Sequence, residues 1–300
     1  MRRIPRRHPS VDDTVLWIAG QTWAIALSGG TKVGNAPPAL EREPLGAFCC
    51  RLASMSTLRI AAVIPARLNS TRLSRKVLRE IAGRPMVEWV WRAAMASGLM
   101  DPVLVATDAE EVVAVCRARG IPAVMTSPDC ASGSDRVREV ALLVDADVYV
   151  NIQGDEPTLT PDFFPPLLAL FERPEVQVAT LAVHCPAEEI ANPNAVKVVA
   201  AIDGRALYFS RATVPFDRDG QGYAGYRKHL GIYAYRKAAL ERFAELPPSR
   251  IEQVERLEQL RLLENGIDIY VAAAPRDTIG VDTEADLARA EAMLKEMAGS

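Results

Sequence analysis

Short apolar runs alternate with helical segments from Leu58 to Ile152, and this alternation constrains the fold more than any other feature. The apolar runs are partly β-branched and end at turn residues, which is typical of buried strands. Strands that alternate with helices of this length predict βαβ units and a parallel sheet with right-handed crossovers. The expected strands are Leu58–Pro65, Val103–Thr107, Pro122–Thr126 and Asp147–Ile152, and the expected helices are Pro85–Ser97, Ala109–Arg119 and Ser134–Val144.

The pattern becomes less regular after Gln153. Three apolar runs without intervening helices predict a small mixed sheet added at one edge, within an insertion of about residues 185–250. We therefore expect an α/β fold with a mostly parallel sheet and a small mixed-sheet insertion. The expected later elements are helix Pro161–Phe171, strands Gln177–Val183, Val196–Ile202, Leu207–Phe209 and Gly231–Tyr235, helix Ile251–Asn265, strand Ile267–Ala272 and helix Glu284–Met297.

Residues 1–57 do not share this organisation. Four arginines precede an apolar patch at Thr14–Leu27, but Asp12 and Asp13 lie where a signal peptide carries no acidic residue. The patch is also too short to span a bilayer. We expect residues 1–57 to be a poorly ordered N-terminal extension without a part in the chemistry, and residues 58–300 to form the functional domain.

Composition and charge argue against several classes of protein. A chain of 300 residues is long enough for a substantial core, and its formal net charge of −3 gives no support to nucleic-acid binding. The five cysteines show no metal-ligand spacing, and their odd number argues against a disulfide framework. We therefore expect a cytoplasmic protein that binds neither nucleic acid nor membrane.

A basic loop follows the first strand. The apolar run ends at Pro65, and the next segment is rich in cationic and hydroxyl side chains. Such cations repel one another without an anionic partner, and ligands of open α/β sheets bind beyond the strand ends. Together with backbone N–H groups they can form a phosphate cradle, although a solvated basic loop is an equal alternative on composition alone. The side chains are those of Arg67, Ser70, Thr71, Arg72, Arg75 and Lys76.

One carboxylate is a candidate for a metal site, and a second carboxylate, taken alone, is more typical of a helix N-terminus. Asp155 follows the fourth strand within Gln153-Gly-Asp-Glu-Pro157, and Asp282 precedes the last helix within Gly280-Val-Asp-Thr283. A carboxylate that faces a phosphate site is repulsive unless a divalent cation lies between them, and one or two carboxylates plus substrate oxygens are typical of Mg²⁺. The alternatives are a turn residue for Asp155 and a helix N-terminal acid for Asp282, beside Thr283 as the N-cap.

Several polar residues have structural interpretations when they are read alone. Ser134 is expected to cap the helix that it begins, with Asp135 favouring its positive end, and Asp108 is expected to cap the helix after it. A lone histidine in a strand, such as His229, is more often structural than functional. Polar residues such as Glu258 are expected on the outer face of a helix.

Seven separated segments resemble, in the same order, motifs of the cytidylyltransferases that activate 3-deoxy-D-manno-octulosonic acid (Kdo), an acidic sugar of bacterial lipopolysaccharide. Spore-coat polysaccharide and sialic acid cytidylyltransferases carry a related first loop, so that loop indicates only the superfamily. The resemblance covers the chain from about Leu58 to Leu294. The segments are VIPAR-x-x-STRL-x-x-K at 63–76, SGSDR at 132–136, QGDEP at 153–157, FSR and R-x-H-x-G-I-Y at 209–211 and 227–233, LEQLR at 257–261, and GVDT at 280–283.

The resemblance implies a Rossmann-like nucleotidyltransferase fold of the glycosyltransferase-A-like kind. It implies transfer of CMP from CTP to the anomeric hydroxyl of Kdo with Mg²⁺ as cofactor, for lipopolysaccharide biosynthesis. It also implies a homodimer that pairs through the inserted sheet, to which we expect Tyr226–Tyr235 to contribute.

The resemblance also assigns roles to single residues. The implied catalytic residues are Arg67, Lys76 and Asp155, and the implied metal ligands are Asp155 and Asp282. The implied CTP-binding residues are Pro65, Ala66, Arg67, Ser70, Arg72, Lys76, Ser132, Gly133, Arg136 and Gln153. The implied sugar-binding residues are Arg211, His229, Tyr233, Glu258 and Gln259.

One departure from the family pattern concerns the first loop. The family usually has Pro-Gly before the loop lysine, whereas Ser74 and Arg75 precede Lys76 here, which removes the conformational freedom of glycine. Two alternatives to the Kdo reaction stay open. One is the same transfer to another acidic sugar, such as 8-amino-Kdo or a nonulosonic acid. The other is a non-catalytic nucleotide-sugar-binding protein, against which the two carboxylates and the lysine argue.

Overall fold

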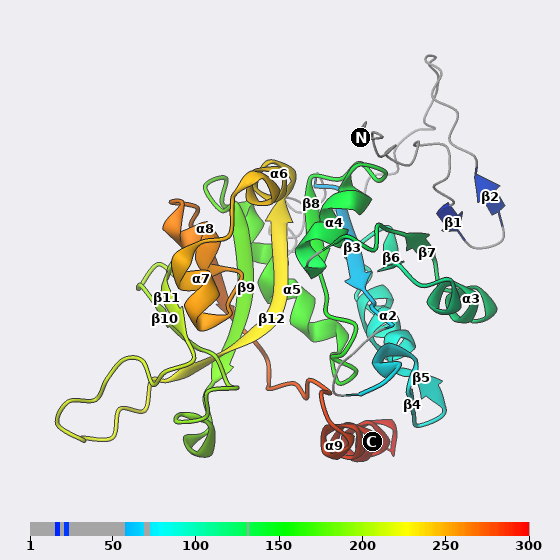
Figure 1. Ribbon diagram of the computed structural model, residues 1–300. Helices are drawn as coiled ribbons and strands as arrows, with labels where there is room; N and C mark the ends of the chain where they lie inside the picture. Colours follow the sequence, from blue (N-terminus) through cyan, green and yellow to red (C-terminus); the bar gives the residue numbers. More distant parts are fainter. Residues whose placement is uncertain (1–15, 19–20, 24–57, 69–72, 131, 300) are drawn as a thin grey trace, which may run out of the picture.

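The computed structural model describes residues 16–18, 21–23, 58–68, 73–130 and 132–299. Strand β3 (Ile60–Pro65) lies within its large mixed sheet, with β8 (Val148–Asn151) parallel on one side and β6 (Val103–Thr107) parallel on the other. Strand β7 (Ala123–Met125) is parallel to β6. These four strands and the helices between them confirm the βαβ units that the alternation predicts (Figure 1).

Helices cover both faces of this sheet, and the residues of β3 alternate between two hydrophobic cores. Ile60, Ala62 and Ile64 pack with α2 (Met86–Ala96), α3 (Glu110–Ala118) and α5 (Phe164–Ala169). Ala61 and Val63 pack with α4 (Gly133–Ala141), α6 (Lys237–Glu245) and α8 (Leu260–Glu264). Every residue of β3 is buried because both faces are covered, which explains why the strand is a continuous apolar run.

The inserted strands extend the same sheet beyond β8. The long strand β12 (Arg227–Arg236) is antiparallel to both β8 and β9 (Val178–His184), and β13 (Ile269–Ala273) is parallel to β9. Strands β10 (Lys197–Ala200) and β11 (Ala206–Ser210) form an antiparallel edge beside β12. The sheet is therefore mostly parallel at β3 and mixed in the insertion, and the predicted fold class is confirmed (Figure 1).

Three local predictions differ from the structure. The predicted helix Ile251–Asn265 is wrong, because Arg256 adopts a left-handed conformation with φ 54° and separates α7 (Arg250–Glu255) from α8. The predicted helix Pro161–Phe171 is split into α5 and two flanking 3-10 turns. Helix α6, packed beside α4, has no counterpart among the predicted elements.

The structure describes six residues of the N-terminal extension. Strands β1 (Leu16–Ile18) and β2 (Gln21–Trp23) are antiparallel to each other, and β1 pairs with the edge strand β7. This pairing was not expected from the sequence. The rest of residues 1–57 lies outside the described residues, so the expectation of a poorly ordered extension without a chemical part stays a prediction.

Two further observations concern membranes and thiols. Within the described part of the chain, no helix is long and apolar enough to cross a membrane. Cys116, Cys130 and Cys185 are buried free thiols, and burial raises the pKa of each of them. Cys49 and Cys50 lie outside the described residues.

The residue before the 3-10 turn at Lys76–Leu78 is in the left-handed conformation although it is not a glycine. Arg75 has φ 55° and ψ 32°, at the position where the resembling family has glycine. Its guanidinium forms an ion pair with the exposed carboxylate of Glu111 on α3. The loop therefore follows the turn that a glycine would favour, although the left-handed region costs an L-residue about 1–2 kcal/mol.

We expect Arg75→Gly to raise the free energy of unfolding by roughly 0.5–1 kcal/mol. The relieved strain exceeds the entropy that glycine gains in the unfolded chain, and an exposed ion pair contributes little. Urea denaturation measures the change. Arg138→Gly inside α4 is the matched control, since Arg138 is exposed, and it should instead lower stability by about 1 kcal/mol. A destabilised Arg75→Gly protein would show that the Glu111 pair outweighs the strain.

Candidate active site

Three loops meet at the carboxyl end of β3. A Cβ atom on Gly154 would lie 2.9 Å from the carbonyl oxygen of Pro65, and one on Gly133 would lie 3.4 Å from its Cγ. The loop after β8 and the start of α4 therefore approach Pro65 so closely that a side chain at Gly154 would displace them. Of the predicted CTP-binding residues, Pro65, Gly133 and Gln153 are brought together here, since a Cβ atom on Gly133 would also lie 3.6 Å from Nε2 of Gln153.

Lys76 lies between the two predicted metal ligands. Its Nζ atom is 2.6 Å from Oδ2 of Asp155 and 2.6 Å from Oδ1 of Asp282. The lysine is only 7% exposed. Burial lowers its pKa, but the charge of Asp155 and hydrogen bonds to both carboxylates outweigh burial, so the pKa of Lys76 is raised above its usual value. The backbone N–H of Val281 also donates to the carbonyl of Asp155 at 2.9 Å, which fixes the two loops together.

The two carboxylates suit a hard divalent cation. They already share one cation, the ammonium of Lys76, so a positive charge fits between them. In the described ranges, no group of three or more histidine, cysteine, aspartate or glutamate side chains could hold a metal ion. Two carboxylates that leave the other positions to water and phosphate oxygens match the way proteins hold Mg²⁺.

The carboxylates open into a cleft of about 870 Å³. Asp155 and Asp282 line one part of it, and Arg211 and His229 line another. The turn 192–195 and residues 277–280 also form part of its wall. Two of the predicted sugar-binding residues thus share a cavity with both predicted metal ligands.

Arg211 is held by backbone carbonyls. Its Nε donates to Glu255 O at 2.7 Å, Nη1 donates to Pro193 O at 2.9 Å, and Nη2 donates to Arg256 O at 3.3 Å. An arginine has five N–H donors, so these three bonds leave donors for a ligand in the cleft. Among the residues that the structure describes, no carboxylate forms an ion pair with this guanidinium.

His229 is a neutral histidine in the wall of the cleft. Its Nε2 lies 3.0 Å from Oγ1 of Thr180, and this hydroxyl donates to Ile232 O at 2.7 Å. The hydroxyl therefore accepts from the imidazole, which places the ring proton on Nε2. Burial lowers the pKa of His229 to about 3, so the ring carries no charge near neutral pH.

A second, smaller cavity of about 120 Å³ contains the other predicted sugar-binding residues. The hydroxyl of Tyr233 and Nε2 of Gln259 are buried there without a hydrogen-bond partner among the described residues. Buried polar atoms are nearly always hydrogen-bonded, so these two indicate a ligand or ordered water. Burial also raises the pKa of Glu258, whose Oε2 accepts from Ser134 Oγ at 3.3 Å.

Gln153 lies between the two cavities. It lines the smaller one, and its Cγ would lie 3.7 Å from a Cβ on Gly231, which lines the larger one. The break at Arg256 turns Gln259 inward, to 8% exposure, rather than leaving it on an outer helix face. The expectation of an outer helix face for this segment is therefore wrong.

The start of α4 differs in detail from the prediction. Ser132, not Ser134, is the N-cap, and its side chain accepts from Asp135 N–H while the Asp135 carboxylate accepts from Ser132 N–H. Arg136 is fully buried and donates to Asp108 at 2.7 Å. Asp108 therefore does not cap α3, contrary to prediction. The buried guanidinium of Arg136 contacts the turn before α4 from the protein interior.

The first loop is described only in part. Pro65 and Ala66 are buried, and Arg67 is exposed and donates from Nη2 to Cys130 O at 2.6 Å. The predicted phosphate-binding residues Ser70 and Arg72 lie outside the described residues. Arg67 thus bridges the first loop and the segment that leads to Ser132.

Lys228 is a cleft residue that sequence reasoning missed. Its Nζ lies 2.6 Å from Oε2 of Glu189 and 2.9 Å from Oδ2 of Asp277, and all three residues line the larger cavity. Its place within the R-x-H segment was the only signal in the sequence, because its two acidic partners are distant along the chain.

The fold and the site together define a nucleotidyltransferase. A family model described as cytidylyltransferase matches residues 61–269. The 3-deoxy-manno-octulosonate cytidylyltransferase of Acidobacterium capsulatum is 69% identical over 242 residues, which are 81% of this chain and 99% of that protein. The enzyme of the same name from Koribacter versatilis is 55% identical over 259 residues, which are 86% of this chain and 98% of that protein.

A solved structure is similar over the same region. It is a CMP:2-keto-3-deoxy-manno-octonic acid synthetase in complex with CTP, with a TM-score of 0.77 and 42% identity. The match covers 80% of this chain and 99% of that one. The chain therefore belongs to the 3-deoxy-manno-octulosonate cytidylyltransferase family, and the resemblance found in the sequence is confirmed.

We expect the buried neutral His229 to make stability depend on pH. The unfolded chain binds a proton on this ring near pH 6.5, but the folded protein does so only near 3. The unfolded state binds more protons between these values, so stability falls as pH falls through this window, by about 1.4 kcal/mol per unit. His229→Gln keeps a donor for Thr180 but cannot titrate, and should lose less stability between pH 7 and pH 5 in urea denaturation.

The matched control is His184→Gln, which removes an exposed histidine. Equal losses of stability for His229→Gln and the unsubstituted protein would contradict a buried neutral imidazole.

Proposed function

We propose that this chain transfers CMP from CTP to the anomeric hydroxyl of 3-deoxy-D-manno-octulosonate and releases pyrophosphate, as a step toward lipopolysaccharide. The observation that carries the proposal is Lys76 between Asp155 and Asp282 at the mouth of the larger cleft. Membership of the family and the similarity to a CTP-bound synthetase support it. The expected cytoplasmic location stays a prediction.

The nucleotide occupies the loops around the carboxyl end of β3. Arg67 and Lys76 bind the phosphates, with Ser70 and Arg72 of the same loop in support. The cytosine lies against the start of α4, where Ser132 and Gly133 offer backbone groups and Arg136 holds the turn from beneath. Gln153 lies where the nucleotide and sugar halves of the site adjoin.

Asp155 and Asp282 hold Mg²⁺ in this proposal. Both carboxylates contact the ammonium of Lys76, so a cation fits between them, and their oxygen atoms are the donors that Mg²⁺ prefers. Bound there, Mg²⁺ would offset the triphosphate charge and lower the pKa of the attacking sugar hydroxyl.

The reaction is an in-line displacement at phosphorus. The anomeric hydroxyl of the sugar gives its proton to water, and its oxygen bonds to the α-phosphorus of CTP, while the bond from this phosphorus to the bridging oxygen breaks and pyrophosphate leaves. Arg67 and Lys76 stabilise the charge that develops on the phosphate oxygens. The contribution of the protein is therefore mainly positioning and electrostatic stabilisation.

The acidic sugar occupies the larger cleft and reaches toward the smaller cavity. The free donors of Arg211 bind its carboxylate, because a guanidinium matches a carboxylate in two-point geometry. The neutral imidazole of His229 and the unpartnered groups of Tyr233 and Gln259 meet sugar hydroxyls, as does Glu258. Adjacent cavities of unequal size suit an extended eight-carbon sugar.

A sugar panel with CTP and Mg²⁺ tests the function. We expect pyrophosphate release with Kdo and little release with sugars that lack the carboxylate. Asp155→Asn should lower turnover by roughly a hundredfold or more, because a carboxylate that offsets charge is replaced by a neutral amide. The control Asp145→Asn changes an exposed carboxylate elsewhere and should leave turnover unchanged.

Other outcomes of the panel decide between the alternatives. A preference for 8-amino-Kdo or a nonulosonic acid would change the assigned sugar substrate but leave the assigned reaction, CMP transfer from CTP, unchanged. Nucleotide-sugar binding without any pyrophosphate release would favour the non-catalytic protein. Near-normal turnover in Asp155→Asn would remove this residue from the mechanism.

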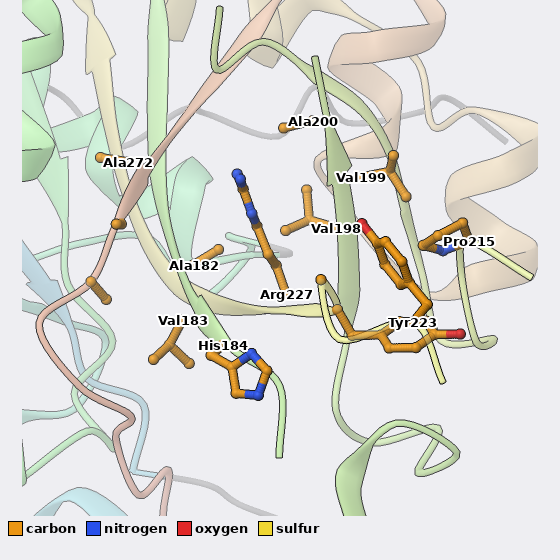
Figure 2. A pocket seen from close by; sticks show the side chains of 14 residues that line it. Ala182, Val183, His184, Val198, Val199, Ala200, Pro215, Tyr223, Arg227 and Ala272 are labelled. Atoms are coloured by element: carbon orange, nitrogen blue, oxygen red, sulfur yellow. The ribbon is translucent and has the colours of Figure 1, made fainter. Parts of the chain in front are cut away.

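The chain also presents a surface suited to a second copy. Most of Tyr226–Tyr235, the expected dimer segment, is buried within the chain itself. The start of this segment lines a hollow of about 390 Å³, where the side chains of Arg227 and His184 lie among small apolar side chains of β9, β10 and residues 272–274, near Tyr223 and Pro215 (Figure 2). Phe216 and Tyr223 are 81% and 48% exposed on the adjoining loop. Exposed aromatic side chains beside a hollow that contains an arginine are typical of protein interfaces, and we propose a homodimer.

We expect light scattering at micromolar concentration to give twice the mass of the chain. Phe216→Asp should shift the population toward the monomer, because it introduces a charge into the proposed interface. The control Leu142→Asp changes an exposed apolar residue on the end of α4 and should not alter the mass. A monomer mass for the unsubstituted protein would contradict the proposal.

A further inference from the structure

Lys197, the first residue of β10, carries an ammonium group inside the protein. The residue is 0% exposed. Its Nζ donates to three backbone carbonyls, those of Asn192 at 2.8 Å, Ala195 at 2.6 Å and Arg211 at 2.9 Å. An ammonium has three N–H donors, so this set uses all of them.

These three carbonyls belong to the wall of the larger cleft. The turn 192–195 and Arg211 both line that cleft. Arg211 in turn donates from Nη1 to Pro193 O at 2.9 Å, within the turn that Lys197 holds at both ends. The two cations therefore fix the same turn from opposite sides, one from the interior and one from the cleft.

The same segment positions His229. The residue after the turn, Val196, accepts the backbone N–H of His229 at 2.8 Å. Lys197 itself pairs with Lys228 in the register between β10 and β12. A shift of the turn would therefore move Arg211 and His229, the two residues that we assign to the sugar in the larger cleft.

A buried ammonium is a costly way to hold a turn. Within the described ranges, no carboxylate forms an ion pair with Lys197, and burial lowers its pKa. An apolar side chain of similar length would avoid this desolvation but would leave three carbonyls without donors. The arrangement adds a positive charge behind Arg211, on the side of the cleft that we assign to an anionic sugar.

We infer that Lys197 is a positioning residue for the acidic sugar. It fixes the turn 192–195 and the main chain of Arg211, so that the guanidinium is presented to the sugar carboxylate. This inference rests on the proposed function, and it assigns Lys197 no contact with the sugar.

Lys197→Met tests the inference, because methionine is similar in length but donates no hydrogen bond. We expect KM for Kdo to rise about tenfold, the loss of roughly one charge-assisted hydrogen bond, while KM for CTP stays within about twofold. Lys197→Arg keeps a charge and donors but displaces them, so its rise should be smaller, about threefold, and still confined to Kdo.

The control variant Leu168→Ala distinguishes a general loss of stability from a loss of positioning. Leu168 is buried in α5, outside both cavities, and its truncation destabilises the core. In Leu168→Ala, the ratio of KM for Kdo to KM for CTP should stay unchanged, even if its melting temperature falls as far as that of Lys197→Met. A merely structural role for Lys197 predicts the same unchanged ratio.

The outcomes decide the inference separately from the function. An unchanged ratio of KM values in folded Lys197→Met would overturn the inference. If that variant does not fold, an unchanged ratio in Lys197→Arg overturns it, and a rise confined to Kdo supports it. No turnover of Kdo by the unsubstituted enzyme would instead overturn the proposed function.

Discussion

The ion contacts of Lys76 with Asp155 and Asp282 are the interaction on which the site depends. The lysine follows β3, one aspartate follows β8, and the other precedes α9 (Glu284–Gly299). Each carboxylate alone would be a turn residue or a helix-capping acid. Their meeting on one ammonium makes the end of the sheet a place for cations and, through them, for phosphates.

The sugar half of the site is built differently. Backbone carbonyls rather than carboxylates hold Lys197 and Arg211, so neither cation is neutralised by an ion pair within the described chain. Burying the ammonium of Lys197 without an ion pair is costly. In the function proposed above, the carboxylate of the sugar supplies an anion on this side of the cleft.

Local structure was predicted well where the sequence pattern and the packing agree. The strand at Val103–Thr107 was placed correctly because all five residues are apolar or small and buried on both faces. The prediction of one helix through Arg256 failed because Arg256 ends α7 in a left-handed conformation, which is uncommon for a residue other than glycine and which nothing in the sequence indicates. The predicted N-cap, Ser134, was wrong because serine is a good cap at either position. Only the reciprocal hydrogen bonds between Ser132 and Asp135 decide that Ser132 caps α4.

The sequence by itself determined the parallel α/β core, the family and the identity of the candidate metal ligands, because alternation and short motifs are local properties. Only the tertiary structure decided which groups share a space. It placed Lys76 between two carboxylates, divided the predicted sugar-binding residues between two cavities, and directed Arg136 to Asp108. It also revealed Lys197, whose three partners are backbone carbonyls. Every residue carries a carbonyl, so no residue type in the sequence can indicate that arrangement.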